Sequence, residues 1–201
     1  MMAASTVYMI RHAEKPDDGS PHLSSRGLAR AQHLRHFFGR DSGFDIGYII
    51  AEHPEQGSST HIWFDFQAVS TYCGASPHPG LYIKLISLYL DSRLHAYETV
   101  KPLADDLGVT VTFNTSIDRD DAAGVASVVN EYKGAGNGNI LICWEHHNLS
   151  DIAKALGIKG FAEGSGGSGE VKYPGSHFDL VWVVPAPYDE VTRVLSQDTL
   201  G

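Results

Sequence analysis

Cysteine, basic charge and long apolar runs are all scarce in this chain of 201 residues. The two cysteines, Cys73 and Cys143, lack C-x-x-C spacing, so the sequence predicts neither a disulfide framework nor a zinc ribbon. Lys and Arg total 15 against 24 Asp and Glu, which argues against non-specific binding to nucleic acid or to an acidic membrane. A small anionic ligand is compatible with this balance, because a few local Arg and His side chains can oppose the overall charge.

The apolar runs are too short to cross a membrane. The longest, LYIKLISLYL, has ten residues and contains Lys84. The stretch MMAASTVYMIRH lacks the basic start and long apolar core of a signal peptide. We therefore expect a cytoplasmic protein without a membrane partner. The hydrophobic fraction of 42% and the length suit a single globular domain over residues 1–201.

Four short apolar runs predict buried strands, and the amphipathic segments between them predict helices. The strands are Thr6–Ile10, Ile46–Ala51, Asn139–Trp144 and Leu180–Val184. The helices are Ser25–Phe38, a segment around Val100–Leu107 with Pro102 near its first turn, Ala122–Tyr132, and Asp151–Leu156 capped by Ser150. Strands that alternate with helices predict an α/β fold, a three-layer α/β/α sandwich around a mainly parallel sheet.

Residues 59–91 differ from the rest of the chain. They hold three charged residues and six aromatic ones in 33 positions, and they lie between a strand and a helix that a short loop normally joins. One interpretation is a cap that shapes substrate access. The other is the translation of a retained intron, or a gene-model error. The sequence leaves both interpretations open.

Polar side chains gather where two predicted strands end. Arg11 and His12 follow the first strand, and His146 and His147 follow the strand that ends at Trp144. Ligands of parallel α/β sheets bind at the carboxyl ends of the strands. Histidine can attack a phosphoryl group, arginine offers a planar fork of donors to phosphate oxygens, and a second histidine can stabilise the transition state. The pattern therefore predicts a phosphate site.

Two motifs resemble those of the histidine phosphatase superfamily, which has the phosphoglycerate mutase-like fold. IRHAEKP, followed by LSSRGLARAQ, resembles the first motif, and ILICWEHH resembles the second. The resemblance covers most of the chain outside residues 59–91. It implies that His12 is the phosphorylated nucleophile, that Arg11 binds the phosphate and that His146 is the second histidine of the pocket.

The chain departs from the family pattern at several positions. Ala13 and His147 stand where many members have glycine, whereas Glu14 matches the acidic residue that commonly follows the first motif. The second phosphate-binding arginine is expected four residues before Thr99, and His95 stands there instead. A protonated histidine can supply part of the charge but not the bidentate fork.

Arg93 lies two residues before His95 and is the other candidate for this role. Whichever of the two acts, we expect weaker phosphate binding than a second arginine at the family position would provide.

The leaving group needs a general acid, and several carboxylates are candidates. The region where the family supplies this group contains Asp118, Asp120 and Asp121, and Glu14 is a further candidate. The sequence does not choose among them, and Asp121 is equally suited to capping the helix that follows. Glu145 is interpreted either as an ion-pair partner or as a catalytic group.

The resemblance implies hydrolysis of a small phosphorylated substrate, a phosphomonoester, through a phosphohistidine on His12. It implies no metal and no organic cofactor, and the 11 histidines show no zinc-binding spacing. One alternative is an impaired or inactive phosphate-binding member. Another is a phosphoglycerate-mutase-type phosphotransferase, which no extra Arg/Lys cluster supports. Arg26, Arg30 and Arg35 are expected on a solvated helix face, and the oligomeric state is left open.

Overall fold

The computed structural model describes residues 5–54, 93–132 and 138–199. The segment 59–91, for which we predict either a cap or a retained intron, lies outside these residues, as does Cys73. No helix in the described ranges combines the length and the apolar composition that crossing a membrane requires. The cytoplasmic location stays a prediction.

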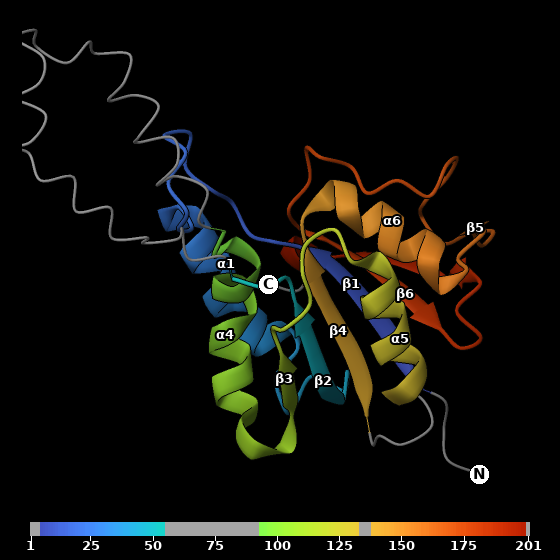
Figure 1. Cartoon of the computed structure of the whole chain (residues 1–201), viewed down its shortest axis with the longest axis horizontal. Helices are drawn as coiled ribbons and strands as arrows, with labels where there is room; N and C mark the ends of the chain where they lie inside the picture. Colours follow the sequence, from blue (N-terminus) through green and yellow to red (C-terminus); the bar gives the residue numbers. More distant parts are fainter. Residues whose placement is uncertain (1–4, 55–92, 133–137, 200–201) are drawn as a thin grey trace, which may run out of the picture.

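A six-stranded sheet in the order β3-β2-β4-β1-β6-β8 forms the centre of the fold (Figure 1). Four adjacent strands are parallel, and the two at one edge, β6 and β8, run antiparallel to their neighbours. The strands are β1 (Thr6–Arg11), β2 (Ile46–Ala51), β3 (Thr112–Asn114), β4 (Asn139–Trp144), β6 (Leu180–Pro185) and β8 (Arg193–Ser196). The four predicted strands are confirmed. Strands β3 and β8 are short and only partly buried, so the sequence contains no apolar run that would predict them.

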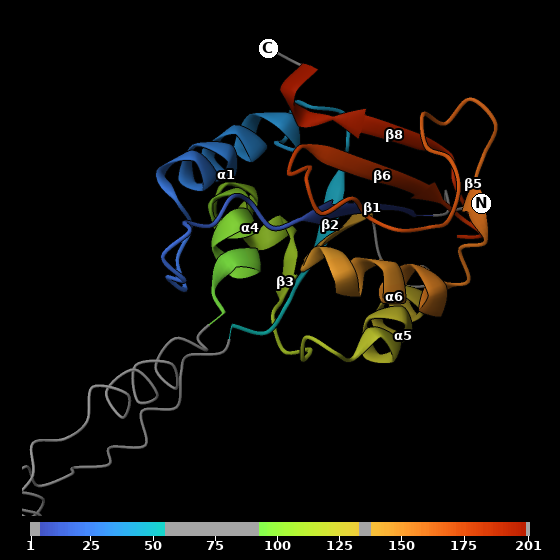
Figure 2. The ribbon, with the colours of Figure 1, turned by 90° about the horizontal axis from the view of Figure 1, so that it is seen from above.

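Two pairs of helices cover the two faces of the sheet (Figures 1 and 2). Alternate side chains of β1 point to opposite faces of the sheet. Tyr8 and Ile10 pack against the first pair of helices, whereas Val7 and Met9 pack against the second pair. The first pair is α1 (Ser25–Phe37) and α4 (His95–Leu107), and the second is α5 (Ala122–Tyr132) and α6 (His146–Leu156). The predicted three-layer α/β/α sandwich is confirmed.

Short elements complete the described fold. A two-stranded parallel sheet joins β5 (Gly160–Phe161) to β7 (Glu190–Val191). Two single turns of 3-10 helix, η1 (Gly108–Thr110) and η2 (Gln197–Thr199), follow α4 and β8.

Helix α6 begins five residues earlier than predicted, at His146 instead of Asp151. Its N-cap is Glu145, whose side chain accepts hydrogen bonds from the backbone N–H groups of His147 and Asn148. Ser150 is therefore no cap; its hydroxyl accepts from the backbone N–H of Tyr173 at 3.2 Å. A glutamate cap is a weak sequence signal compared with serine, which explains the error. As a result, both histidines lie in the first turn of a helix.

Helix α4 also begins earlier than its apolar stripe suggests. It starts at His95, so Pro102 lies in the interior of the helix and not near its first turn. The predicted stripe itself is correct, because Val100, Leu103 and Leu107 are all buried. Packing of this apolar face outweighs the one backbone hydrogen bond that the proline removes.

The segment LSSRG attaches the start of α1 to the chain after β1. The Ser24 hydroxyl accepts from the Gly27 N–H at 3.1 Å and donates to the Glu14 carbonyl at 3.0 Å. A Cβ atom on Gly27 would lie 2.2 Å from that same carbonyl oxygen. Only glycine therefore permits this approach, which holds the residues after β1 against the helix.

Candidate active site at the carboxyl ends of the strands

A cavity of about 460 Å³ opens where β1, β2 and β4 end. Its lining carries charged and titratable side chains of both signs. These are His12, Lys15, Asp17, Glu52, Arg93, His95, Arg119 and Glu145. Three of them, Lys15, Arg93 and Arg119, are basic, which suits a small anion in spite of the acidic charge of the whole chain.

His12 is held rigidly in this cavity. Its backbone N–H donates to the Trp144 carbonyl at 3.0 Å, and its ring Nδ1 lies 2.7 Å from the Ala13 carbonyl oxygen. Because a carbonyl can only accept, Nδ1 carries the proton and Nε2 keeps a free electron pair. Burial lowers the pKa of His12 to about 3, with the charge of Arg11 acting in the same direction. The imidazole is therefore neutral and nucleophilic at ordinary pH.

A second contact anchors the loop that carries this histidine. The backbone N–H of Ala13 donates to the Thr99 hydroxyl at 2.8 Å, and that hydroxyl donates to the His95 carbonyl at 2.6 Å. This chain of hydrogen bonds connects the end of β1 to the first turn of α4. It also brings the His12 and His95 rings to a centroid distance of 5.3 Å.

Arg11 lies next to His12 but under a neighbouring loop. Its Nη1 donates to the Gly175 carbonyl, and its guanidinium carbon lies 3.8 Å from the centre of the Phe178 ring. The side chain is buried, and burial lowers the pKa of Arg11. Within the described ranges, its Nε is a buried donor without a hydrogen-bond partner. Arg11 does not line the cavity described above.

His146 is covered by the same loop. A Cβ atom on Gly175 would lie 2.7 Å from His146 Nε2, so a larger residue there would have to displace the imidazole ring. Burial lowers the pKa of His146, although the carboxylate of Glu145 acts in the opposite direction. Like Arg11, His146 is absent from the lining of the cavity.

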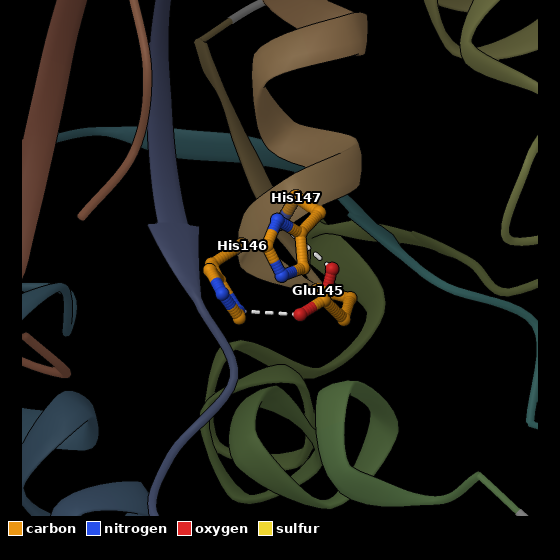
Figure 3. Close-up of side chains that lie close together, drawn as sticks. All are labelled: Glu145, His146 and His147. Atoms are coloured by element: carbon orange, nitrogen blue, oxygen red, sulfur yellow. Dashed lines mark hydrogen bonds and ion pairs between the residues drawn. The ribbon is translucent and has the colours of Figure 1, made fainter. Parts of the chain in front are cut away.

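Glu145, His146 and His147 form a compact group at the start of α6 (Figure 3). One potential ligand atom from each lies within 4.8 Å of the others, so the three could hold a metal ion. The carboxylate already has partners, since one oxygen contacts His146 Nδ1 and the other accepts from the His147 N–H at 2.7 Å. These contacts explain why the three groups lie together. That no metal is needed stays a prediction.

His95 and Arg93 both line the cavity, as expected for replacements of the second arginine. His95 is the first residue of α4, and its Nε2 lies 3.1 Å from the Ser20 carbonyl oxygen. Burial lowers the pKa of His95, so the protonated form that could supply charge is disfavoured. Lys15 and Arg93 also line the cavity, so positive charge near His95 does not depend on protonation of its ring.

The three aspartates that the sequence offers as general acids lie outside the cavity. Asp118, Asp120 and Asp121 are all exposed. Asp120 accepts from the Asn148 side chain at 3.0 Å, and Asp121 accepts from the Gly124 N–H at 2.8 Å. Asp121 thus makes the helix-capping contact that the sequence analysis gave as its alternative role.

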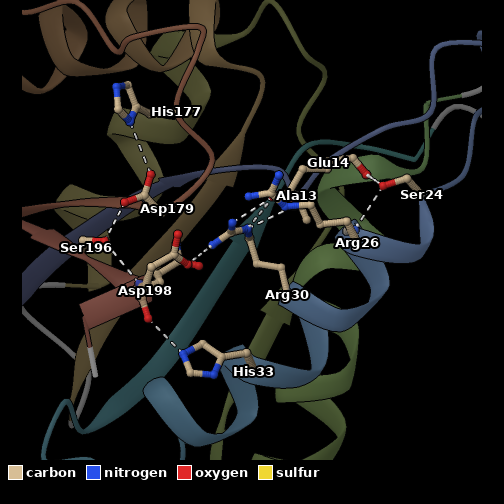
Figure 4. Close-up of polar contacts among 12 residues, drawn as sticks. Ala13, Glu14, Ser24, Arg26, Arg30, His33, His177, Asp179, Ser196 and Asp198 are labelled. Carbon is tan, nitrogen blue, oxygen red and sulfur yellow. Dashed lines mark hydrogen bonds and ion pairs between the residues drawn. The ribbon is translucent and has the colours of Figure 1, made fainter. Parts of the chain in front are cut away.

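Glu14 points away from the cavity and toward α1 (Figure 4). Its carboxylate accepts from Arg30 at 2.8 to 3.2 Å and pairs with Arg26 at 3.0 Å. Arg30 is 9% exposed, so its expected place on a solvated face is wrong. Burial raises the pKa of Glu14, but the hydrogen bonds from Arg30 outweigh burial, and the pKa is lowered overall. Such a group stays ionised and is poorly suited to donate a proton.

Sequence reasoning missed four charged residues of the cavity, Lys15, Asp17, Glu52 and Arg119. Glu52 directly follows β2 and is 6% exposed, and burial raises its pKa to about 7. Arg119 lies between the aspartates considered above; its Nε donates to the Asn148 side chain at 3.1 Å. The rule that singled out His12, a polar residue at a strand end, applies equally to Glu52 and would have found it.

The comparisons with known proteins support the fold. No protein-family profile and no curated protein matches this chain in sequence. Among solved structures, the chain is similar to the protein histidine phosphatase SixA complexed with tungstate. The TM-score is 0.53, the identity is 10%, and the match covers 98% of this chain and 99% of that one. At this identity the likeness shows the architecture alone, and the chain shares its α/β fold with that phosphatase.

Proposed function

We propose that this chain hydrolyses phosphomonoesters through a phosphohistidine intermediate on His12. The observation that carries the proposal is the state of His12: a neutral imidazole with its proton held on Nδ1, in a cavity that three basic side chains also line. The motifs around Arg11 and His146, and the likeness in fold to a histidine phosphatase, support the same reaction.

The first step is an attack by Nε2 of His12 on phosphorus. A P–N bond forms, the P–O bond to the leaving group breaks, and the leaving oxygen takes a proton. Water then attacks the phosphohistidine, the P–N bond breaks, and phosphate leaves. The negative charge that builds up on the phosphoryl oxygens is balanced by the cavity cations Lys15, Arg93 and Arg119.

Arg11 and His146 contribute from beneath the loop that contains Gly175. The buried Nε of Arg11 is suited to a phosphoryl oxygen, because a buried donor without a partner is costly and gains from an anion. His146 stabilises the transferring group in this proposal, and His95 orients it. The substrate is a small phosphorylated molecule, and neither a metal nor an organic cofactor takes part.

The test is hydrolysis of 4-nitrophenyl phosphate by the wild type and by His12→Ala. We expect the substitution to lower kcat/KM at least about 1,000-fold, because the nucleophile is lost. His36→Ala, which removes an exposed histidine of α1, serves as the matched control and should retain activity. The wild type should also carry an acid-labile phosphate on His12 after rapid quenching.

Two outcomes would contradict the proposal. Equal activity in the wild type and in His12→Ala would move the chemistry to another residue. No turnover and no phosphohistidine in the folded wild type would instead favour the impaired, phosphate-binding alternative.

A further inference from the structure

A buried carboxyl group lies in the same cavity as the proposed nucleophile. Glu52 follows β2 directly, and its backbone N–H donates to the Cys143 carbonyl of β4 at 3.3 Å. This contact continues the pairing of β2 with β4 and places Glu52 at the carboxyl edge of the sheet. Its side chain lines the cavity together with His12, although the residue is only 6% exposed.

The other carboxylates near the site have different surroundings. Glu14 is held by two arginines outside the cavity. Glu145 lines the cavity, but it caps α6 and contacts His146. Asp17 also lines the cavity, but it is exposed to water. Glu52 therefore combines two properties that these groups do not share, access to the cavity and shelter from solvent.

The groups around Glu52 come from three further segments. Arg93 precedes α4, Arg119 precedes α5, and Glu145 precedes α6, where its backbone N–H hydrogen-bonds to the Glu52 carboxylate. Burial raises the pKa of Glu52 to about 7, and the charge of Glu145 adds to this, whereas the two arginines and the backbone hydrogen bond lower the pKa. Cys143, on the adjacent strand, is fully buried, and burial raises the pKa of its thiol. At neutral pH a substantial fraction of Glu52 is therefore protonated.

We propose that Glu52 is the general acid of the phosphomonoester hydrolysis described above, an inference that rests on that proposed function. As Nε2 of His12 bonds to phosphorus, the P–O bond breaks and the Glu52 carboxyl passes its proton to the leaving oxygen. The alcohol departs, and Glu52 becomes a carboxylate. In the second step this carboxylate takes a proton from the attacking water while the P–N bond breaks, so the starting state returns.

The dependence on leaving group tests this role. An alkoxide requires a proton to leave, whereas 4-nitrophenolate leaves readily without one. We expect Glu52→Gln to lower kcat/KM by about 100-fold for glycerol 2-phosphate but less than about 5-fold for 4-nitrophenyl phosphate. The kcat/KM value is the informative one, because it reports the step in which the leaving group departs. Glu163→Gln, at an exposed position away from the cavity, is the matched control.

The pH profile of the wild type provides a second readout that needs no variant. With glycerol 2-phosphate, kcat/KM should fall as the pH rises through about 7, where Glu52 loses its proton. With 4-nitrophenyl phosphate this alkaline decline should be weak. In Glu52→Gln the alkaline decline of kcat/KM should be absent for both esters.

The outcomes separate the two proposals. If the wild type hydrolyses both esters but Glu52→Gln lowers kcat/KM by the same factor for each, or not at all, Glu52 is not the general acid. The proposed phosphatase function is then unaffected. If the wild type hydrolyses neither ester and forms no phosphohistidine, the proposed phosphatase function is wrong, and so is the role proposed for Glu52.

Discussion

Two buried glutamates follow strand ends in this protein, and they behave in opposite ways. Glu14 is 8% exposed and Glu52 is 6% exposed, so the two are almost equally removed from water. Nevertheless the pKa of Glu14 is lowered, whereas that of Glu52 is raised to about 7. Burial alone therefore does not decide the charge of a carboxyl group in this fold.

The difference lies in direct hydrogen bonding. Arg30 donates three hydrogen bonds to Glu14 at 2.8, 3.0 and 3.2 Å, and these favour the ionised form. Glu52 instead has a backbone hydrogen bond from Glu145 and lines the same cavity as Arg93 and Arg119, and these contributions together do not outweigh the cost of burial. The first arrangement binds two parts of the fold together, and the second leaves a proton available for transfer.

Breaking the Glu14 arrangement should have the largest effect on stability. We expect Glu14→Gln to lower the free energy of unfolding at pH 7 by about 3–5 kcal/mol, because the buried Arg30 would lose its buried anionic partner and keep the exposed Asp198. Urea denaturation measures the loss, with the exposed Asp18→Asn as control. Since the pKa of Glu14 is lowered on folding, the difference should shrink as the pH falls below its ordinary value of 4.5. A loss under about 1 kcal/mol would mean that the pair contributes little.

Removing the charge of Glu52 should increase stability, by less than the loss of the Glu14 charge decreases it. A carboxyl group whose pKa rises from 4.5 to about 7 on folding costs stability as the pH increases between those values. We expect Glu52→Gln to raise the free energy of unfolding at pH 8 by about 1–3 kcal/mol. At pH 4, where the acid is neutral in both the folded and the unfolded state, this gain should disappear. A variant that is equally stabilised at both pH values would show that ionisation is not the cause.

The ion pair between Arg30 and Asp198 should have the smallest effect on stability. Arg30 Nη1 donates to Asp198 at 3.0 Å, but the Asp198 side chain is 58% exposed (Figure 4). We expect Asp198→Asn to change the free energy of unfolding by less than about 1 kcal/mol, because water screens this pair. Raising the salt concentration should remove most of that difference. An effect as large as that of Glu14→Gln would overturn the distinction between buried and exposed partners.

Local patterns predicted the layers of the fold correctly. Apolar runs marked the four central strands, and the apolar stripes marked the helices that pack on them, because periodicity reflects which face of an element is buried. The start of α6 was misplaced, because its cap is a glutamate. Polar residues at strand ends also pointed to His12, whose place in the cavity follows from the parallel sheet.

The sequence by itself determined the period of each element and the chemistry available at each strand end. The tertiary structure alone decided which of those groups meet. Arg30 reaches Asp198 across 168 positions, and Arg11 reaches the Gly175 carbonyl across 164. Pairs so distant leave no local pattern, since their contact depends on how the layers pack. For the same physical reason, the sequence does not show that Glu14 pairs with Arg30 or that Glu52 lines the same cavity as His12.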